Sequence, residues 1–330
     1  MKAILDGKSL LGRFLFLSVL LVAGSASAQK AIDGQSVRSL LAAGRADEVV
    51  QLIQPKAAQA LADAESYNLL CRAYFMVEEW DHGIPACERA REIDPQKASY
   101  SLWLGRIYGE KADHVGFISA AGLAKKVRES FERAVELEPK SWEARTDLAE
   151  FYLEAPGIVG GGKDKAHQQA DAIMVLNPPM AHWVEARIAE KDGDTAAAER
   201  EYRAEIASSH SGTRGWLDLA AFQRRTHHFE EMEESLRSLE AGTVDRRESL
   251  MDAGSLLWHA GRDFPMALRF LRRYLEAPVE EGPAFKAHDL LGRILEKQGD
   301  VQGAAGEYRK ALALAANYAK AKEDLRRVER

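Results

Sequence analysis

One order of residue types recurs along this chain about every 34 residues, and it limits the fold more than any other feature. The first copy reads YNLLCRAY at 67–74, ACERA at 86–90 and Asp94-Pro95, and the second reads LGRIY at 104–108, FERA at 131–134 and Glu138-Pro139. A repeat of about 20 to 50 residues is typical of arrays in which each unit is one small helical or strand motif. The chain is therefore predicted to be a stack of similar units.

One small residue in each unit gives the register of the repeat. These residues are Cys71, Gly105, Ala149, Ala186, Ala220, Gly254 and Gly292. The steps between them are 34, 44, 37, 34, 34 and 38 residues, so insertions interrupt a basic period of 34. One more step back reaches Val37, which predicts a degenerate unit before the seven clear ones.

The pattern within a unit is helical. Tyr67, Cys71 and Tyr74 have the spacing i, i+4, i+7 and lie on one face of a helix. Ala, Leu, Glu, Arg and Lys are abundant, whereas Pro occurs only 10 times in 330 residues. A single helix pair cannot bury such a face, so neighbouring units must cover it.

The repeat resembles the tetratricopeptide repeat in its period, its small residues and the proline after the second segment. The resemblance implies an all-α, right-handed superhelical solenoid of tetratricopeptide-type helix pairs. We accordingly divide the chain into a signal peptide (1–28), a degenerate helical repeat (29–62), seven repeats (63–317) and a C-terminal capping helix (318–330). The polar run at 320–327 suits the exposed end of a solenoid.

The N-terminus has the features of a secretory signal peptide. Basic residues at positions 2, 8 and 13 precede an apolar core at 14–23, and Ala26-Ser27-Ala28 predicts cleavage after Ala28. The alternative is an uncleaved anchor, although the core is about half the ~20 residues of a spanning helix. We expect an exported protein, periplasmic or secreted, with no membrane span after cleavage.

Two insertions interrupt the repeats, near 109–122 and 155–163. The first is predicted to form a loop or short helix that carries Phe117 and Ile118. These two side chains either pack on the next repeat or contact a partner or a second copy of the chain. The second contains Gly160, Gly161 and Gly162 and is either a plain connector or a loop that contacts a partner.

The second insertion also matches the spacing of a phosphate-binding loop, G-x-x-x-x-G-K, from Gly157 to Lys163. Such a loop needs Ser or Thr after the lysine and a preceding strand. Here Asp164 follows the lysine, and the preceding segment is helical in pattern. We therefore expect no nucleotide, and we expect Asp164 to cap the next helix.

The rest of the sequence shows no recognisable catalytic or metal-binding motif. The nine histidines include no H-E-x-x-H pair, the cysteines are not spaced as CxxC, and there is no G-x-S-x-G. We expect no cofactor and no enzymatic activity. With 45 basic against 51 acidic residues, the composition does not suggest a nucleic-acid partner either.

The two cysteines, Cys71 and Cys87, fall at positions that face each other in the tetratricopeptide family. This resemblance leaves two alternatives, a disulfide between the two helices of one repeat or two buried thiols.

The resemblance also implies which residues line the concave side of the solenoid. The candidate partner-binding residues are Asn68, Arg72, Arg106, Trp183, Arg187, Arg224, Trp258 and Arg293. The same repeat position is occupied by Arg72, Arg106, Arg187 and Arg293. These arginines favour an extended acidic peptide or a free C-terminus as the partner, because a guanidinium group can bind a carboxylate through two hydrogen bonds. Alternatively, the arginines pair with glutamates of the chain, and the tryptophans belong to the core.

We conclude that the chain is a non-enzymatic scaffold that binds a protein or peptide on its concave side, in the cell envelope or outside the cell. The alternative is a structural subunit that assembles with itself or with an envelope machine. The partner is not specified by the sequence, because solenoids of this kind serve many functions.

Overall fold

The computed structural model describes residues 34–59, 61–209, 212–277 and 283–330. The chain divides into two units, residues 1–31 and residues 32–330. The first unit, which includes the predicted signal peptide, lies outside the described residues. All of the described residues belong to the second unit.

The described residues form α-helices and one short 3₁₀ turn, η1. In chain order these are α1 (Gly34–Ala42), α2 (Ala46–Ala58), α3 (Ala64–Met76), α4 (Trp80–Ile93), α5 (Ala98–Asp113), α6 (Phe117–Leu137), α7 (Trp142–Glu154), η1 (Gly157–Val159), α8 (Lys163–Met174), α9 (Pro178–Asp192), α10 (Thr195–Ser208), α11 (Thr213–Arg225), α12 (Phe229–Ala241), α13 (Glu248–Ala260), α14 (Phe264–Tyr274), α15 (Ala284–Lys297), α16 (Val301–Leu314) and α17 (Ala319–Val328).

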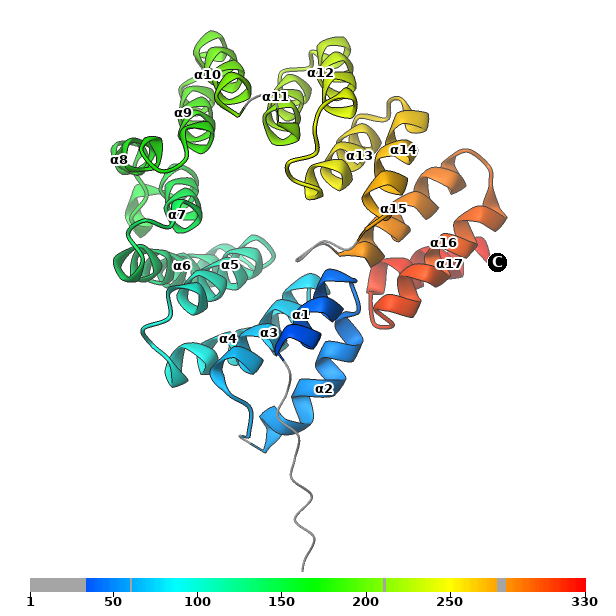
Figure 1. The fold of residues 1–330 in the computed structure, drawn as a ribbon, viewed down its shortest axis with the longest axis horizontal. Coiled ribbons are helices and arrows are strands. Elements are labelled where there is room, and N and C mark those ends of the chain that lie inside the picture. Colours follow the sequence, from blue (N-terminus) through cyan, green and yellow to red (C-terminus); the bar gives the residue numbers. More distant parts are fainter. Residues whose placement is uncertain (1–33, 60, 210–211, 278–282) are drawn as a thin grey trace, which may run out of the picture. The chain divides into compact units, whose positions relative to one another are not determined.

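The helices pack as consecutive pairs, from α1 with α2 to α15 with α16, and α17 follows the last pair (Figure 1). Each pair also packs on the next one along the chain. In Figure 1, α5, α11 and α13 lie on the inner side of the array, and α6, α12 and α14 lie on the outer side. The predicted all-α solenoid is confirmed.

Aspartates begin several of the helices in the same way. Asp63, Asp194, Asp263 and Asp300 each accept a hydrogen bond from the backbone N–H three residues later, at 2.7 to 3.0 Å. Such a cap satisfies one of the free N–H groups of a first turn. The prediction for Asp164 was wrong: Gly162 is the N-cap of α8, and Asp164 lies in the first helical turn, where its charge suits the helix dipole.

The small residues mark where the two helices of a pair approach most closely. A Cβ atom at Gly105 would overlap the ring of Phe131, and one at Gly292 would overlap the ring of Tyr308. In each case the aromatic side chain comes from the second helix of the same pair. The glycine therefore provides the space that the aromatic ring fills.

The first insertion is helical rather than a projecting loop. It lengthens α5 to 16 residues and α6 to 21 residues, with a short break at 114–116. Alanines at 120, 121 and 124 favour helix over loop. Phe117 and Ile118 begin α6 and are 82% and 88% exposed, so they do not pack on the next repeat.

The second insertion is fastened to the helices around it. Arg128 of α6 donates a hydrogen bond to the carbonyl oxygen of Val159 at 3.1 Å, and Lys165 donates one to that of Gly160 at 2.8 Å. Gly160 has a φ of 105°, and a Cβ atom at Gly161 would overlap the backbone of Ala155. These two glycines are therefore required by the path of the loop.

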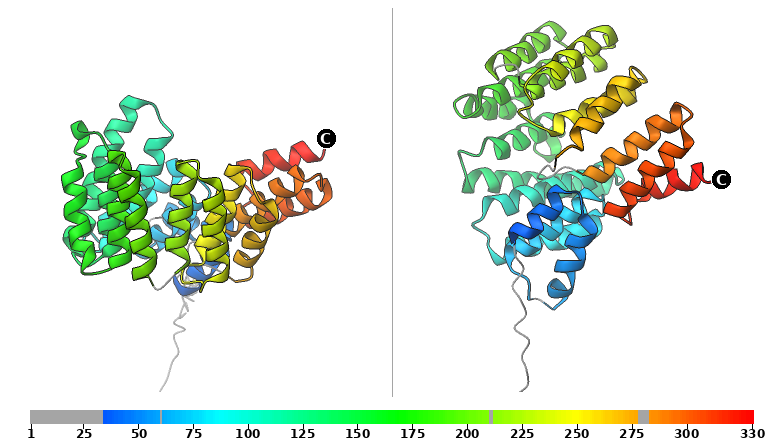
Figure 2. Two further views of the ribbon diagram at one scale, coloured as in Figure 1. Left: turned by 90° about the horizontal axis from the view of Figure 1, so that it is seen from above. Right: turned by 45° about the vertical axis from the view of Figure 1, so that its right-hand side comes forward.

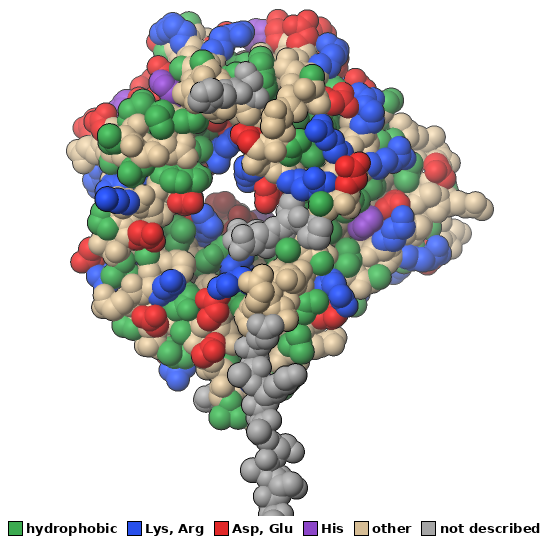
Figure 3. Space-filling model, viewed as in Figure 1, with side chains coloured by type: hydrophobic (Ala, Val, Ile, Leu, Met, Phe, Trp, Pro, Cys, Tyr) green, Lys and Arg blue, Asp and Glu red, His purple; other side chains and the backbone are tan. Residues whose placement is uncertain are grey.

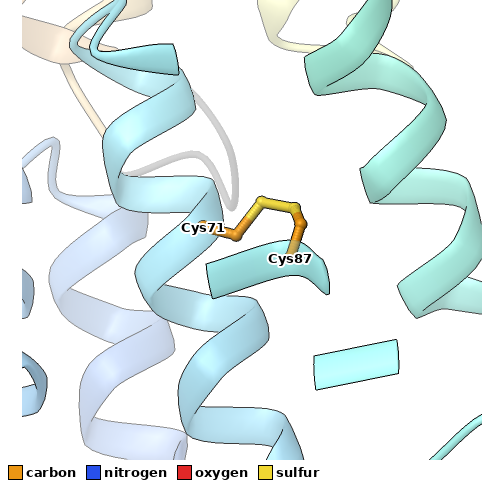
Figure 4. The surroundings of a disulfide bond; sticks show 2 residues. All are labelled: Cys71 and Cys87. Carbon is orange, nitrogen blue, oxygen red and sulfur yellow. A yellow bond between two sulfur atoms is a disulfide. The ribbon is translucent and has the colours of Figure 1, made fainter. Parts of the chain in front are cut away.

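A disulfide joins Cys71 of α3 to Cys87 of α4 (Figure 4). Their Cα atoms lie 5.2 Å apart, and both residues are fully buried. Of the two alternatives for these cysteines, the structure has the bonded one. The bond fixes the two helices of the second pair to each other.

Gly105 and Gly109, both in α5, form a matched test of close packing. Gly109 has open space where a Cβ atom would lie. We expect Gly109→Ala to stabilise the protein by up to about 1 kcal/mol, because alanine is the better helix former. Gly105→Ala should instead destabilise it by about 1 to 3 kcal/mol through overlap with Phe131. Urea unfolding followed by circular dichroism measures both, and equal effects would contradict this account.

The disulfide closes a loop between residues separated by 16 positions. We expect its reduction to lower the free energy of unfolding by about 3 kcal/mol, mainly because the unfolded chain gains freedom. Urea titrations with and without a reductant measure the difference. The double variant Cys71→Ala/Cys87→Ala is the control, because its stability should not respond to the reductant.

Candidate functional site

The inner side of the array is the candidate site, because the first helix of each pair lies there. A hollow opens near the middle of the molecule, with acidic and basic side chains at its rim (Figure 3). Successive first helices carry charged side chains that pair with each other, so the arrangement of these charges depends on how one pair stacks on the next.

The predicted arginines pair with carboxylates on neighbouring first helices. Arg106 of α5 binds Asp147 of α7 at 2.6 Å, and Arg187 of α9 binds Glu154 of α7 at 2.9 Å. Arg293 of α15 binds Asp324 of α17 at 2.5 Å. The arrangement fits the alternative in which the arginines pair with acidic residues of the chain itself. A role of these arginines in binding stays a prediction.

Asn68 and Arg72 are less accessible than the sequence suggested. Asn68 is 3% exposed and Arg72 is 8% exposed. The guanidinium groups of Arg72 and Arg106 each lie 5.0 Å from the ring centre of Trp103, which contacts Phe75 edge to face. Arg72 thus serves as a packing partner of Trp103 as well as a charge.

The other predicted residues are half-buried. Trp183 packs against the core and faces Arg214 at 5.9 Å, and Arg224 is in α11. Trp258 and Arg293 line one depression of about 630 Å³ together with Arg327. Asn68 and Arg72 line another of about 650 Å³ near the N-terminal pairs. The structure therefore places four of the eight predicted residues in two separate depressions, and the other four line neither of them.

Carboxylates lie at the centre of the inner face, and sequence reasoning missed all of them except Glu150. Glu150 in α7 is exposed, but the surrounding protein desolvates its carboxyl and raises its pKa, and Asp147 and Glu154 raise the pKa further, against the effects of Arg187 and Arg214. Burial also raises the pKa of Asp252 in α13, and Asp218 adds to this shift. Carboxylates outweigh arginines here, which the sequence signalled only through Glu150.

Glu205 of α10 is a buried carboxyl beside this region, 1% exposed. Burial and then Asp218 raise its pKa to about 10, although Arg214 lies 4.0 Å away. A side-chain hydrogen bond with Asp218 also raises the pKa of Glu205, because it favours the protonated carboxyl. Glu205 is therefore protonated at neutral pH and does not add charge to the inner face.

Asp289 of α15 is 3% exposed and lies at the C-terminal part of the inner face. Burial raises its pKa to about 6, and Asp324 adds to the shift although Arg293 opposes it. The carboxylate of Asp289 lies 3.3 Å from the guanidinium of Arg293. Ionising Asp289 at neutral pH therefore costs free energy in the folded protein.

A second candidate surface consists of exposed apolar side chains at the two insertions. Besides Phe117 and Ile118, Ile158 in η1 is 93% exposed. Gly160, Gly161 and Gly162 do not themselves present such a surface, because they shape the loop that carries Ile158. Ile158 was missed because a short loop gives no periodic pattern from which exposure could be inferred.

The described residues include no cluster of three side chains suited to hold a metal ion. None of their helices is both long and apolar enough to cross a membrane. Lys163, the lysine of the apparent phosphate-binding motif, pairs with Asp192. The segment before the motif is helix α7.

Comparison with solved structures identifies the architecture. Yeast Tom70 aligns with a TM-score of 0.53 and 13% identity over 86% of this chain and 58% of its own. The chain has a tetratricopeptide-like fold. A tetratricopeptide repeat protein from Parabacteroides merdae aligns with 14% identity over 87% of this chain and 99% of its own, with a TM-score of 0.40. Of the yeast protein Tom70, this chain spans somewhat over half the length.

No family model and no curated protein matches the sequence. At the identities given above, the likeness to solved structures establishes the fold alone.

Asp289 predicts a pH dependence of stability. The folded protein holds this proton up to about pH 6, whereas an unfolded aspartate releases it near 3.9. The free energy of unfolding should therefore fall by up to about 3 kcal/mol as the pH rises from 4 to 7. We expect Asp289→Asn to be about 1 to 3 kcal/mol more stable than the parent at pH 8, and near the parent at pH 4. Urea titrations at both pH values test this, and a difference that does not change with pH would contradict it.

Proposed function

We propose that this chain is a non-enzymatic interaction scaffold that binds a protein segment along the inner face of its solenoid. The main observation that supports this proposal is the arrangement of charges on that face. Its arginines pair with acidic residues of the chain, and Glu150 and Asp252 add carboxylate at the centre. Lysine or arginine side chains of a partner would lower the energy of these crowded carboxylates. The favoured partner is therefore an extended segment with basic groups rather than an acidic peptide.

We also propose that the protein works outside the cytoplasm, in the periplasm or after secretion. The signal-peptide pattern at 1–28 supports this location. The Cys71–Cys87 disulfide supports it as well, because such bonds form and persist in oxidising compartments.

The exposed apolar residues favour a second candidate function, assembly with a second copy or with another envelope protein. Phe117, Ile118 and Ile158 project from the turns of two successive helix pairs. Large apolar side chains exposed in this way are often found at interaction surfaces. This surface lies at the turns, whereas the charges discussed above lie on first helices.

Site-specific photocrosslinking in cells separates these functions. A photoreactive residue replaces Glu150 on the inner face, Ile118 at the start of α6, or the exposed Gln168 of α8 as a matched control. We expect position 150 to crosslink to one defined protein through a basic segment, which mass spectrometry identifies. We expect no such product from position 168.

A charge reversal then tests the reason for binding. Asp252→Lys should reduce the crosslink from position 150 several-fold while the helical circular dichroism stays unchanged, because the added cation repels a basic segment. An undiminished crosslink would contradict a charge-based mechanism. Crosslinks of position 118 to a second copy, with none from position 150, would favour self-assembly instead.

A further inference from the structure

The first two helix pairs of the array contact the last pair and α17, although more than 200 residues separate these segments in sequence. Glu78, in the turn between α3 and α4, pairs with Lys286 of α15 at 2.8 Å and with Lys320 of α17 at 3.0 Å. Asp47 of α2 accepts a hydrogen bond from the backbone N–H of Ala316 at 2.5 Å. The orange and red helices accordingly lie beside the blue ones in Figures 1 and 2. We call these interactions the end contact.

The end contact also has an apolar part that is incompletely packed. The turn at Gly44 approaches α15 so closely that a Cβ atom there would lie 3.0 Å from that of Ala284. A cavity of about 110 Å³ remains nearby, lined by Leu41, Phe75 and Pro283 among others. A void removes packing contacts from the side chains around it. The end contact therefore leaves some space unfilled, although buried Phe285, Ala315 and Tyr318 on its C-terminal side belong to the same apolar cluster as Val37 and Leu41.

The backbone at Glu78 has a conformation that is unfavourable for any residue other than glycine. Glu78 has a φ of 64°, in the left-handed region that favours glycine. The turn between the helices of a pair has the same hydrogen-bond pattern at Gly44, Gly193, Gly261 and Gly299. His227 shares the pattern and the positive φ, and it makes no interaction with the other end of the chain in the described part of the structure. Glu78 differs because its side chain joins the two ends.

We propose that the end contact is releasable and that it controls the access of bulky partners to the inner face. A solenoid is stabilised by contacts between neighbouring repeats, so its two ends can separate without breaking any of those interfaces. The ion pairs of Glu78 are partly exposed, and salt screens such pairs. The consequence for partner entry rests on the function proposed above, whereas the opening of the end contact does not.

The distance between the two ends tests the opening directly. Spin labels are attached to cysteines introduced at the exposed Gln54 of α2 and Gln302 of α16, while the native cysteines are buried in their disulfide. We expect Glu78→Gly to lengthen and broaden the measured distance distribution, because it removes the bridging carboxylate. His227→Gly relieves the same backbone strain elsewhere and should leave the distribution unchanged. A Glu78→Gly distribution equal to that of the parent would overturn the proposal.

A second matched pair of variants acts on the apolar side of the end contact. Gly44→Ala and Gly193→Ala both place a Cβ atom on a left-handed backbone, with φ values of 72° and 77°. A Cβ atom at Gly44 would press against Ala284 of α15, whereas one at Gly193 would lie in open space. Gly44→Ala alone should lengthen the distance. Equal distributions for the two variants would count against the apolar part of the contact, and circular dichroism checks that both are folded.

Access to the inner face is measured without any partner. A cysteine replaces Glu150, and its reaction rates with a small maleimide and with a polyethylene-glycol maleimide are compared. Glu78→Gly should raise the rate of the bulky reagent about fivefold or more relative to the small one, because the rate follows the fraction of open molecules. An unchanged ratio in a variant whose ends have separated would overturn the control of access. If photocrosslinking finds no partner, both measurements here remain valid, so the two proposals can fail separately.

Discussion

The close approach of two helices at a small residue is the interaction on which the rest of the structure depends. Gly105 faces Phe131, and Gly292 faces Tyr308, so in each of these pairs a large ring fills the space beside a glycine. This contact sets the distance between the two helices of a pair. It leaves the opposite apolar faces open, and only the neighbouring pairs can cover them. The long array follows from this local geometry.

Polar pairs repeat in the same register as the apolar core. Tyr202 donates a hydrogen bond to Glu190, and Tyr308 donates one to Glu296, with a spacing of 12 residues in both pairs. His182 and Glu201 have the same spacing of 19 residues as His288 and Glu307. The pairs α9 with α10 and α15 with α16 thus share polar as well as apolar positions. A repeat unit therefore specifies where its buried hydroxyl groups find acceptors.

The sequence predicted the array well because its period is a local property. Helix pairing, the small residues and the role of α17 after the last pair can be read from spacing within one or two units. The first insertion was predicted as a loop or a short helix, and the structure has the helical form, in which the added residues lengthen α5 and α6 instead of forming a separate helix. Asp164 was misplaced by two residues because Gly162 ends the preceding loop.

The candidate site was harder to predict because it depends on contacts between units. Arg106, Arg187 and Arg293 lie on first helices, as predicted, but Asp147, Glu154 and Asp324, with which they pair, come from neighbouring helix pairs or from α17. Which carboxylate each arginine reaches depends on the rotation between successive pairs, and the sequence of one unit does not state that rotation. The end contact depends on the sum of all these rotations. Glu78 could therefore not be connected with Lys320 from the repeat pattern.

Net charge is a poor guide to what such a protein binds. Removal of residues 1–28 would take away three basic residues and one acidic residue, which leaves 42 against 50 and a formal charge of −8. Many of these charges are paired between helices, as Arg225 is with Glu190 and Arg327 with Glu296, and paired charges contribute little to the field felt by a partner. A partner instead meets the local excess of carboxylates around Glu150 and Asp252. The specificity of the inner face therefore depends on the few carboxylates that the stacking of repeats crowds together.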